Sequence, residues 1–299
     1  QTGRLLRNRT STPTPALTSS PDSIAPTLMT PERYSSVSTT EDAQFGISPT
    51  TPESRLPSTG RFSTSPAIRS SPTAAISAFS ARLIRNRDVE GTENIRSYLY
   101  GTLKELPSPW LLKDMDKAVE IFQEKIKEHR KIRIIGDYDI DGVTSTCILL
   151  KGFQRLGADV DTYIPDRIKD GYGIHDHLIE KAKEDGIDTI VTCDNGISAA
   201  DQISFAKSLG MTVVVTDHHE IPFEDTGEGR KYKLPPADAI INPKQPDCKY
   251  PEKKLCGAVV ALKLVTALYE ACGIPERELE DYYELAAIAT VGDVMDLQG

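Results

Sequence analysis

Short apolar strands alternate with helices through the second half of the chain, and this alternation restricts the fold more than any other feature. β-Branched apolar runs of strand length recur there, separated by stretches whose apolar residues lie three or four positions apart. This pattern predicts an α/β fold, a parallel sheet with helices on both faces. Asp114 is suited to cap the first helix and Gly157 to end the second. The predicted strands are residues 131–137, 158–165, 187–194, 211–217 and 237–243, and the predicted helices are residues 111–129, 142–157, 174–186, 198–210, 256–273 and 277–293.

The amino-terminal part of the chain has a different composition. Of the first 75 residues, 38 are Ser, Thr or Pro, and neither helical nor strand periodicity is visible. Such a segment buries too little apolar surface to offset the entropy that is lost on ordering. We therefore expect a disordered Ser/Thr/Pro-rich tail over residues 1–76, a helical segment over residues 77–130 that leads into the sheet, and the α/β domain over residues 131–299.

The net charge argues against a nucleic acid held by electrostatics alone. Residues 1–75 contribute +2 to the chain's net charge of −9, which leaves −11 on the remainder. A surface that binds a polyanion by charge is usually basic. A polyanion bound here would therefore need metal ions beside it.

Cysteine spacing and hydropathy indicate the compartment. The five cysteines are scattered and show no CxxC spacing, which is typical of reduced thiols in a cytosolic protein. No apolar run approaches the roughly 20 residues of a membrane helix. We expect a cytoplasmic protein with no membrane partner.

Acidic and imidazole side chains gather where the predicted strands and the last helix end. Parallel sheets place their sites outside the carboxyl ends of the strands, so we expect these side chains to converge on one edge. Clustered carboxylates repel one another unless cations lie between them, and carboxylates with one or two imidazoles suit Mn²⁺ or Mg²⁺. The residues are Asp137, Asp139, Asp141, Asp194, Asp217, His218, His219 and Asp293.

The stretch DIDGVT at residues 139–144 admits a second interpretation. It resembles the start of a haloacid-dehalogenase-type phosphatase, in which Asp139 would be the nucleophile and Asp141 the acid and base. The later GDVMD would then be a distal Mg²⁺ motif. That interpretation gives no role to Asp194 or to residues 217–219, and burying such a cluster unpaired is costly.

Four segments, in this order and spacing, resemble the motifs of the DHH phosphoesterase superfamily. They are GDYDIDG, TCDNGIS, VTDHHE and ATVGDVMDL. The segment DRIKDGYGIHDHLIE, which contains Arg167, is similar to the RecJ branch of that superfamily, the single-stranded-DNA-specific exonucleases. The upstream segment LLKDMDKAVE is similar to the same branch. The likeness covers roughly residues 80–299 and does not include the tail.

The resemblance implies a site with two metal ions, usually Mn²⁺ and alternatively Mg²⁺. By motif position, Asp139 is expected to bind one ion, Asp141 the other, and Asp194 both. His218 and Asp293 are expected to complete the shell of the second ion.

The resemblance also assigns roles to the neighbours of these ligands. His219 is expected to face the scissile phosphate and to stabilise its charge. Asp217 is better suited to orient an imidazole than to bind metal. Many family members have a histidine where this chain has Ile135, so Asp137 is the local candidate to complete the shell of the first ion.

Three further residues are candidates for substrate binding. Asn195 and Ser198 could donate hydrogen bonds to a phosphate at the start of the following helix. Arg167 lies in the segment that resembles the RecJ branch and is expected to contact the substrate.

The resemblance implies a metal-dependent phosphodiesterase that removes nucleotides from the 5′ end of single-stranded DNA in repair and recombination. A helicase or a single-strand-binding protein would be a further partner. A phosphodiesterase for short oligonucleotides or cyclic dinucleotides is an alternative within the family, and a non-catalytic binding module is an alternative outside it. Relatives carry a second, smaller domain with a glycine-rich motif, whereas this chain ends six residues after Asp293. We therefore expect this stretch to bind metal and to degrade DNA weakly or not at all.

Overall fold

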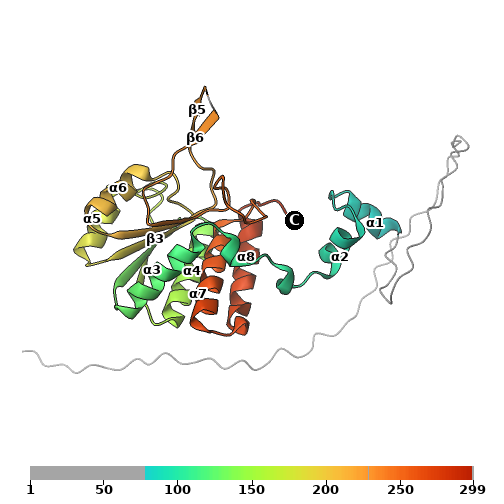
Figure 1. Cartoon of the computed structure of the whole chain (residues 1–299), viewed down its shortest axis with the longest axis horizontal. Coiled ribbons are helices and arrows are strands. Elements are labelled where there is room, and N and C mark those ends of the chain that lie inside the picture. The colour runs from blue at the N-terminus through green and yellow to red at the C-terminus, as the bar shows by residue number, and fades with distance from the viewer. Residues whose placement is uncertain (1–77, 228, 298–299) are drawn as a thin grey trace, which may run out of the picture. The chain divides into compact units, whose positions relative to one another are not determined.

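A computed structural model describes residues 78–227 and 229–297, which contain a five-stranded parallel sheet (Figure 1). The strands of this sheet are β1 (Lys131–Ile135), β2 (Asp159–Tyr163), β3 (Thr189–Cys193), β4 (Thr212–Thr216) and β7 (Ala239–Ile241). Their order is β2-β1-β3-β4-β7, and each neighbouring pair is parallel. β1 therefore lies inside the sheet, with β2 on one side and the later strands on the other. The predicted parallel α/β sheet is confirmed.

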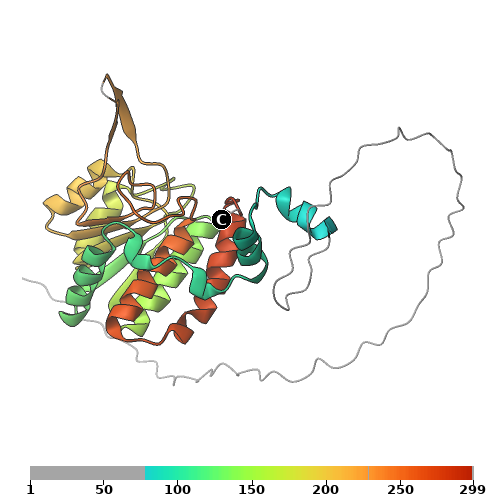
Figure 2. The same cartoon turned by 45° about the vertical axis from the view of Figure 1, so that its right-hand side comes forward.

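Helices cover both faces of the sheet (Figures 1 and 2). Ile134 and Val191 pack into the core beneath one helical layer, and Ile135 and Ile190 pack into the core beneath the other. Successive side chains of a strand point to opposite faces, so a strand buried on both sides must be apolar throughout. One layer contains α3 (Met115–Lys127), α4 (Ile140–Arg155), α7 (Gly257–Cys272) and α8 (Glu280–Gly292), and the other contains α5 (Asp176–Glu184) and α6 (Ala200–Ser208).

Several short elements complete the described chain. α1 (Ala78–Arg85), α2 (Thr92–Tyr100) and the 3₁₀ turns η1 (Leu103–Glu105) and η2 (Pro109–Leu111) precede the sheet, and η3 (Glu276–Leu279) precedes α8. An antiparallel hairpin of β5 (Phe223–Thr226) and β6 (Gly229–Tyr232) follows β4 and projects from the sheet in Figure 2. This hairpin was not predicted, because both its strands are exposed and carry no apolar alternation. The tail predicted over residues 1–76 lies outside the described residues.

Two helix ends test the predictions about capping. Gly157 follows α4 with φ 78°, the left-handed conformation expected of a glycine that ends a helix. Asp114 precedes α3, but its side chain makes no capping hydrogen bond. Its Oδ1 accepts from Lys117 Nζ at 2.7 Å, and its Oδ2 accepts the backbone N–H of Ile240 in β7 at 3.3 Å. The predicted capping role was therefore wrong, and Asp114 ties α3 to the sheet.

Two properties bear on the sequence-based expectations about compartment. No helix among residues 78–227 and 229–297 is long and apolar enough to span a membrane. The five cysteines all have free thiols, and Cys193 and Cys256 are buried.

Candidate metal centre

The strand order brings the predicted site residues to one edge of the sheet. The direction in which strands are added reverses between β1 and β3, and open α/β sheets bind ligands outside the carboxyl ends of the strands at such a point. That edge receives the segments after β1, β3 and β4 and the carboxyl end of α8. The side chains that meet there are Asp137, Asp139, Asp141, Asp194, Asp217, His218, His219 and Asp293.

One cluster consists of Asp137, Asp139 and Asp194, whose ligand atoms all lie within 4.8 Å of one another. Asp137 is 3% exposed, and its Oδ1 has no hydrogen-bond partner among the described residues. Asp139 is the N-cap of α4 and accepts the N–H of Gly142 on Oδ1 at 2.8 Å. Ile135 is a fully buried core residue. The structure thus brings Asp137, and not residue 135, to this cluster.

Asp194 directly follows β3 and has a left-handed backbone conformation with φ 59°. Residues other than glycine rarely adopt this conformation, and they keep it only where the surrounding structure holds them. Its N–H donates to the Thr216 carbonyl at 3.1 Å. The side-chain amide of the next residue, Asn195, donates to the carbonyls of Ile135 and Cys193 at 3.3 and 3.1 Å. These bonds hold the turn that carries the Asp194 carboxylate.

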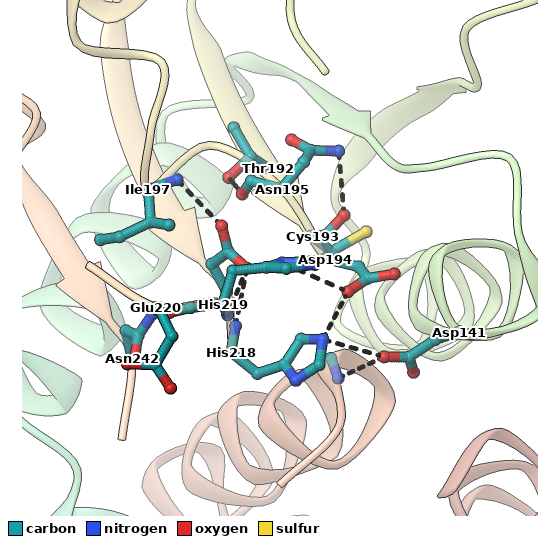
Figure 3. A network of polar contacts seen from close by, with 12 residues as sticks. Asp141, Thr192, Cys193, Asp194, Asn195, Ile197, His218, His219, Glu220 and Asn242 are labelled. Atoms are coloured by element: carbon teal, nitrogen blue, oxygen red, sulfur yellow. Dashed lines mark hydrogen bonds and ion pairs between the residues drawn. The ribbon is translucent and has the colours of Figure 1, made fainter. Parts of the chain in front are cut away.

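A second cluster consists of Asp141, His218 and Asp293. The Nε2 atom of His218 lies 3.6 Å from Asp141 Oδ2 and 3.7 Å from Asp293 Oδ2. Figure 3 shows the same ring pointing between Asp141 and Asp194, whose Oδ1 is 3.0 Å from Nε2. Asp194 therefore belongs to the first cluster and contacts the second.

Asp217 orients the neighbouring imidazole of His219. Its Oδ1 lies 2.7 Å from His219 Nδ1 and accepts the N–H of His218 at 2.7 Å, while its Oδ2 accepts the N–H of Ile197 at 2.9 Å. Burial opposes ionisation of Asp217, but these hydrogen bonds outweigh it and lower its pKa. The bond to Asp217 in turn raises the pKa of His219. The Nε2 atom of His219 is left to face the Tyr172 hydroxyl, 3.4 Å away.

Burial makes Asp137, Asp194 and Asp293 unfavourable as bare charges. Burial, followed by the Asp141 and Asp139 carboxylates, raises the pKa of Asp194 to about 10. Burial also raises the pKa values of Asp137 and Asp293. No lysine or arginine of the described residues forms a salt bridge with these carboxylates. Oxygen ligands with an imidazole, and buried oxygens without partners, fit a hard divalent cation, which would favour the ionised form.

The sequence matches a known family over the region that carries these clusters. A family model described as the DHH family, N-terminal domain, matches residues 131–290. The chain belongs to the DHH family. The haloacid-dehalogenase interpretation is therefore wrong. Asp141, its proposed acid and base, is fully buried against α7 and next to His218, where no solvent reaches it.

Curated relatives of this DHH chain are bacterial enzymes of greater length. The single-stranded-DNA-specific exonuclease RecJ of Bacillus subtilis is 41% identical over 217 residues, which cover 73% of this chain and 26% of the relative. The enzyme of the same name from Escherichia coli is 37% identical over 227 residues, which cover 72% of this chain and 37% of the relative. This DHH chain thus spans about a quarter to two fifths of the curated relatives it matches.

Solved structures match the same part of this DHH chain. A crystal structure of exonuclease RecJ bound to manganese has 35% sequence identity and a TM-score of 0.55, and the match covers 63% of this chain and 45% of that one. RecJ from Thermus thermophilus in complex with Mn²⁺ has 30% identity and a TM-score of 0.50, with 72% and 30% covered. The predicted resemblance to the RecJ branch is confirmed.

The three predicted substrate residues of this DHH chain have different surroundings. Ser198 is exposed and lines a pocket of about 500 Å³ that also contacts His219. Arg167 is exposed, and its guanidinium carbon lies 5.3 Å from the centre of the Tyr138 ring, within the first motif. Asn195 is 1% exposed and its amide N–H groups bind backbone carbonyls, so it makes a structural contact where a phosphate donor was predicted.

Two contacts at the centre were not predicted from the sequence. One is the approach of the Tyr172 hydroxyl to His219, for which the glycine-flanked GYG at residues 171–173 was a signal. The other joins Asp141 to the start of α7, where the backbone N–H groups of Gly257 and Ala258 donate to it. No sequence signal marks that contact, because its partners are 116 residues apart.

Proposed function

We propose that this chain contains the metal-dependent phosphodiesterase centre of an exonuclease that acts on single-stranded DNA. One observation carries the proposal: two clusters of ligand atoms meet at a common carboxylate, Asp194. Nucleases and phosphatases use two adjacent cations in this way to cleave phosphate esters. The activity named for the RecJ relatives and the manganese in their structures support the proposal.

Each cluster would hold one divalent cation, with Asp194 available to both. Carboxylates with an imidazole suit Mn²⁺, and Mg²⁺ is also compatible with this ligand set. When bound, two such cations lower the pKa of a water molecule and neutralise charge on the phosphate. The proposed ligands are Asp137, Asp139, Asp141, Asp194, His218 and Asp293.

His219 would donate a hydrogen bond from Nε2 to an oxygen of the scissile phosphate. Its Nδ1 is already held by Asp217, which fixes the plane of the ring and favours the protonated imidazole. A charged donor is well suited to stabilise charge that develops on the phosphate. The phosphate would replace the Tyr172 hydroxyl, which lies next to the same Nε2.

Arg167 and Ser198 would bind the DNA strand beside the centre. Arg167 is exposed and forms no salt bridge with any described residue, so its guanidinium is available to a backbone phosphate. Ser198 lines the pocket next to His219. The rest of the chain outside residues 1–75 is strongly acidic, so cations at the centre must supply most of the positive charge for DNA.

The wider role is proposed from similarity to the longer RecJ relatives. It comprises digestion from the 5′ end, a function in DNA repair and recombination, cooperation with a helicase or single-strand-binding protein, and a cytoplasmic location. These properties belong to whole proteins, of which this chain spans about a quarter to two fifths. They are therefore proposed for the polypeptide that contains this domain.

The test begins with cation binding by this chain. Calorimetric titration with Mn²⁺ should give two ions per chain, and crystals soaked in Mn²⁺ should show two anomalous peaks on either side of Asp194. Asp161→Asn, an acid-to-amide change at the Arg133 ion pair, is the matched control and should leave both results unchanged. One ion or none in the wild-type chain would contradict a two-metal centre.

The substrate class is tested separately with labelled nucleic acids. Release of mononucleotides from a long single strand labelled at its 5′ end supports the exonuclease. Cleavage restricted to dinucleotides or cyclic dinucleotides would instead support a phosphodiesterase for short oligonucleotides. Both assays compare Mn²⁺ with EDTA, because hydrolysis that persists in EDTA would contradict metal dependence.

A further inference from the structure

The first turn of α7 borders the metal centre and is capped by a residue from another helix. The N-cap residue of α7, Cys256, makes no side-chain capping bond. Instead, the N–H groups of Gly257 and Ala258 donate to the two oxygens of Asp141 at 2.5 and 2.8 Å. Helix N-termini carry unpaired N–H groups and a positive dipole end, which favour an acidic partner. These two bonds fix the orientation of the Asp141 carboxylate.

At Gly257, the start of α7 leaves no room for a side chain beside the two ligand clusters. A Cβ atom at this position would lie 2.8 Å from Asp194 Cβ, 2.9 Å from Asp194 Oδ1 and 3.0 Å from Asp141 Oδ2. Non-bonded carbon atoms pack at about 3.5–4.0 Å. A methyl group at Gly257 would therefore overlap one ligand residue from each cluster.

Neither of these two carboxylates can simply turn out into solvent. Asp141 is fully buried, and Asp194 is 2% exposed. The Cβ of Asp194 can move only with its backbone, which is left-handed and hydrogen-bonded to Thr216. A side chain at Gly257 must therefore either push α7 away from the edge of the sheet or turn the two carboxylates apart.

We propose that the first turn of α7 positions the metal ligands, and that Gly257 sets the separation between the Asp141 and Asp194 carboxylates. A side chain at this position would weaken or prevent the binding of two divalent cations together. Gly257 is a positioning residue, because it acts through two ligands and contacts neither substrate nor reacting atoms. The inference rests on the function proposed above, since it concerns the same metal centre.

The experiment compares Mn²⁺ binding by Gly257→Ala with that of a matched glycine variant. Gly152, on α4, is the control, because a Cβ there would lie 2.6 Å from Val265 Cγ2 on α7. Gly152→Ala thus crowds the same pair of helices, roughly two turns of α7 away from the centre. Calorimetric titration and the electron paramagnetic resonance of bound Mn²⁺ give the number of ions and their affinity. The melting temperature of each metal-free variant is measured in parallel.

The wild-type chain and Gly152→Ala are expected to bind two Mn²⁺ with equal affinity, even if Gly152→Ala melts at a lower temperature. Gly257→Ala is expected to bind one Mn²⁺, or two with roughly 10- to 100-fold lower affinity, which is the range seen when groups that orient metal ligands are lost. Two-ion binding by Gly257→Ala at wild-type affinity would overturn the inference. Equal losses in both variants would also overturn it, because they would assign the effect to helix packing.

Two further outcomes keep the inference separable from the proposed function. Failure of the wild-type chain to bind two ions overturns the proposed function itself. If Gly257→Ala is insoluble, Mn²⁺ binding is measured on Ala258→Pro instead. Proline is tolerated in the first helical turn, and it removes the N–H that binds Asp141 Oδ1. Ala258→Pro is expected to weaken Mn²⁺ binding by about 10-fold. Wild-type affinity in that variant would contradict a positioning role for this turn.

Discussion

Two groups of charged side chains lie along β1, and they are arranged in opposite ways. On the strand, the buried Arg133 donates to Asp161 of β2 at 2.6 and 2.7 Å and to Asp185 at 3.0 Å. Lys181 of α5 also donates to Asp185, at 2.6 Å. Beyond the end of the strand, the carboxylates around Asp194 have only imidazoles as basic partners among the described residues. The first group is neutralised within the chain, whereas the second requires cations from outside.

This difference distinguishes a structural ion pair from a binding site. Hydrogen bonds from Lys181 and Arg133 lower the pKa of Asp185, so the folded chain favours its charged form. Burial raises the pKa of Asp194, so the folded chain without metal favours its neutral form. Acidic groups whose pKa values rise on burial, in an arrangement with ligand spacing, are typical of sites that bind a positive ligand.

The largest effect that would test this comparison is expected from Asp194→Asn. Loss of the shared carboxylate should lower Mn²⁺ affinity by more than about 100-fold, beyond the range for groups that only orient a ligand. The same change should raise the melting temperature of the metal-free protein, because asparagine tolerates the left-handed backbone and is neutral without taking up a proton. Titration calorimetry and thermal melts in EDTA measure the two effects. If metal-free Asp194→Asn melts below the wild type, then Asp194, like the Arg133 ion pair, stabilises the fold without metal. That result would contradict the comparison.

The next effect is a pH dependence of the metal-free protein. The raised pKa values of Asp137, Asp194 and Asp293 mean that the folded state holds more protons than the unfolded state above pH about 4. The free energy of unfolding should therefore fall as the pH rises from about 4 through neutrality, by up to about 1.4 kcal/mol per pH unit for each proton involved.

Mn²⁺ should reduce this slope, because bound carboxylates are already ionised. Urea unfolding between about pH 5 and pH 8, in EDTA and in Mn²⁺, measures both slopes. Equal slopes in the two conditions would show that the titrating groups do not bind the metal.

A smaller effect is expected from Asp217→Asn, which removes the main cause of the raised pKa of His219. The imidazole should then lose its proton at lower pH, which shifts the alkaline limb of the activity profile downward and slows hydrolysis at neutral pH by roughly 10- to 100-fold. In the wild type, the His219 contribution to stability is complete below pH about 6.5 and is lost as the pH rises through the raised pKa.

Nuclear magnetic resonance titration of His219 measures this change directly. Asp170→Asn is the control, because it removes the carboxylate 3.1 Å from the exposed imidazole of His177. It should leave the His219 titration unchanged. An unshifted His219 in Asp217→Asn would show that Asp217 does not set the protonation of this ring.

The smallest effect is expected from Arg133→Met, which removes the ion pairs with Asp161 and Asp185. It should destabilise the fold by about 1–2 kcal/mol, less than the loss of a fully buried pair costs, because the Asp161 side chain is 50% exposed and can be solvated. The number of bound Mn²⁺ ions should stay the same. Chemical denaturation and metal titration check the two statements, and a change in metal number would mean that the two groups are coupled.

The parts of this structure that the sequence predicted depend on local signals and one topological rule. Apolar runs located the strands, and carboxyl ends of parallel strands share one edge, so Asp137, Asp194 and His218 could be expected to meet. The replacement of a histidine by Ile135 likewise pointed to its neighbour Asp137. The structure brings these residues together as expected.

The parts that escaped prediction depend on partners distant in the sequence. Asp114 has the residue type and position of a cap, yet it binds a strand that follows much later in the chain. Asn195 has the residue type of a phosphate donor, yet carbonyls at two strand ends occupy its amide. Residue type alone does not show which of several possible partners is nearest once the sheet has formed. The hydrogen bond from the Gly257 N–H to Asp141 is the clearest example.

Asp137 directly follows the first strand of the sheet, and Asp293, the last proposed ligand, directly follows α8. A ribosome-bound nascent polypeptide therefore has no second cluster until α8 has emerged from the exit tunnel. The proposed phosphodiester cleavage needs both clusters, so a nascent chain could not begin it before Asp293 has left the ribosome.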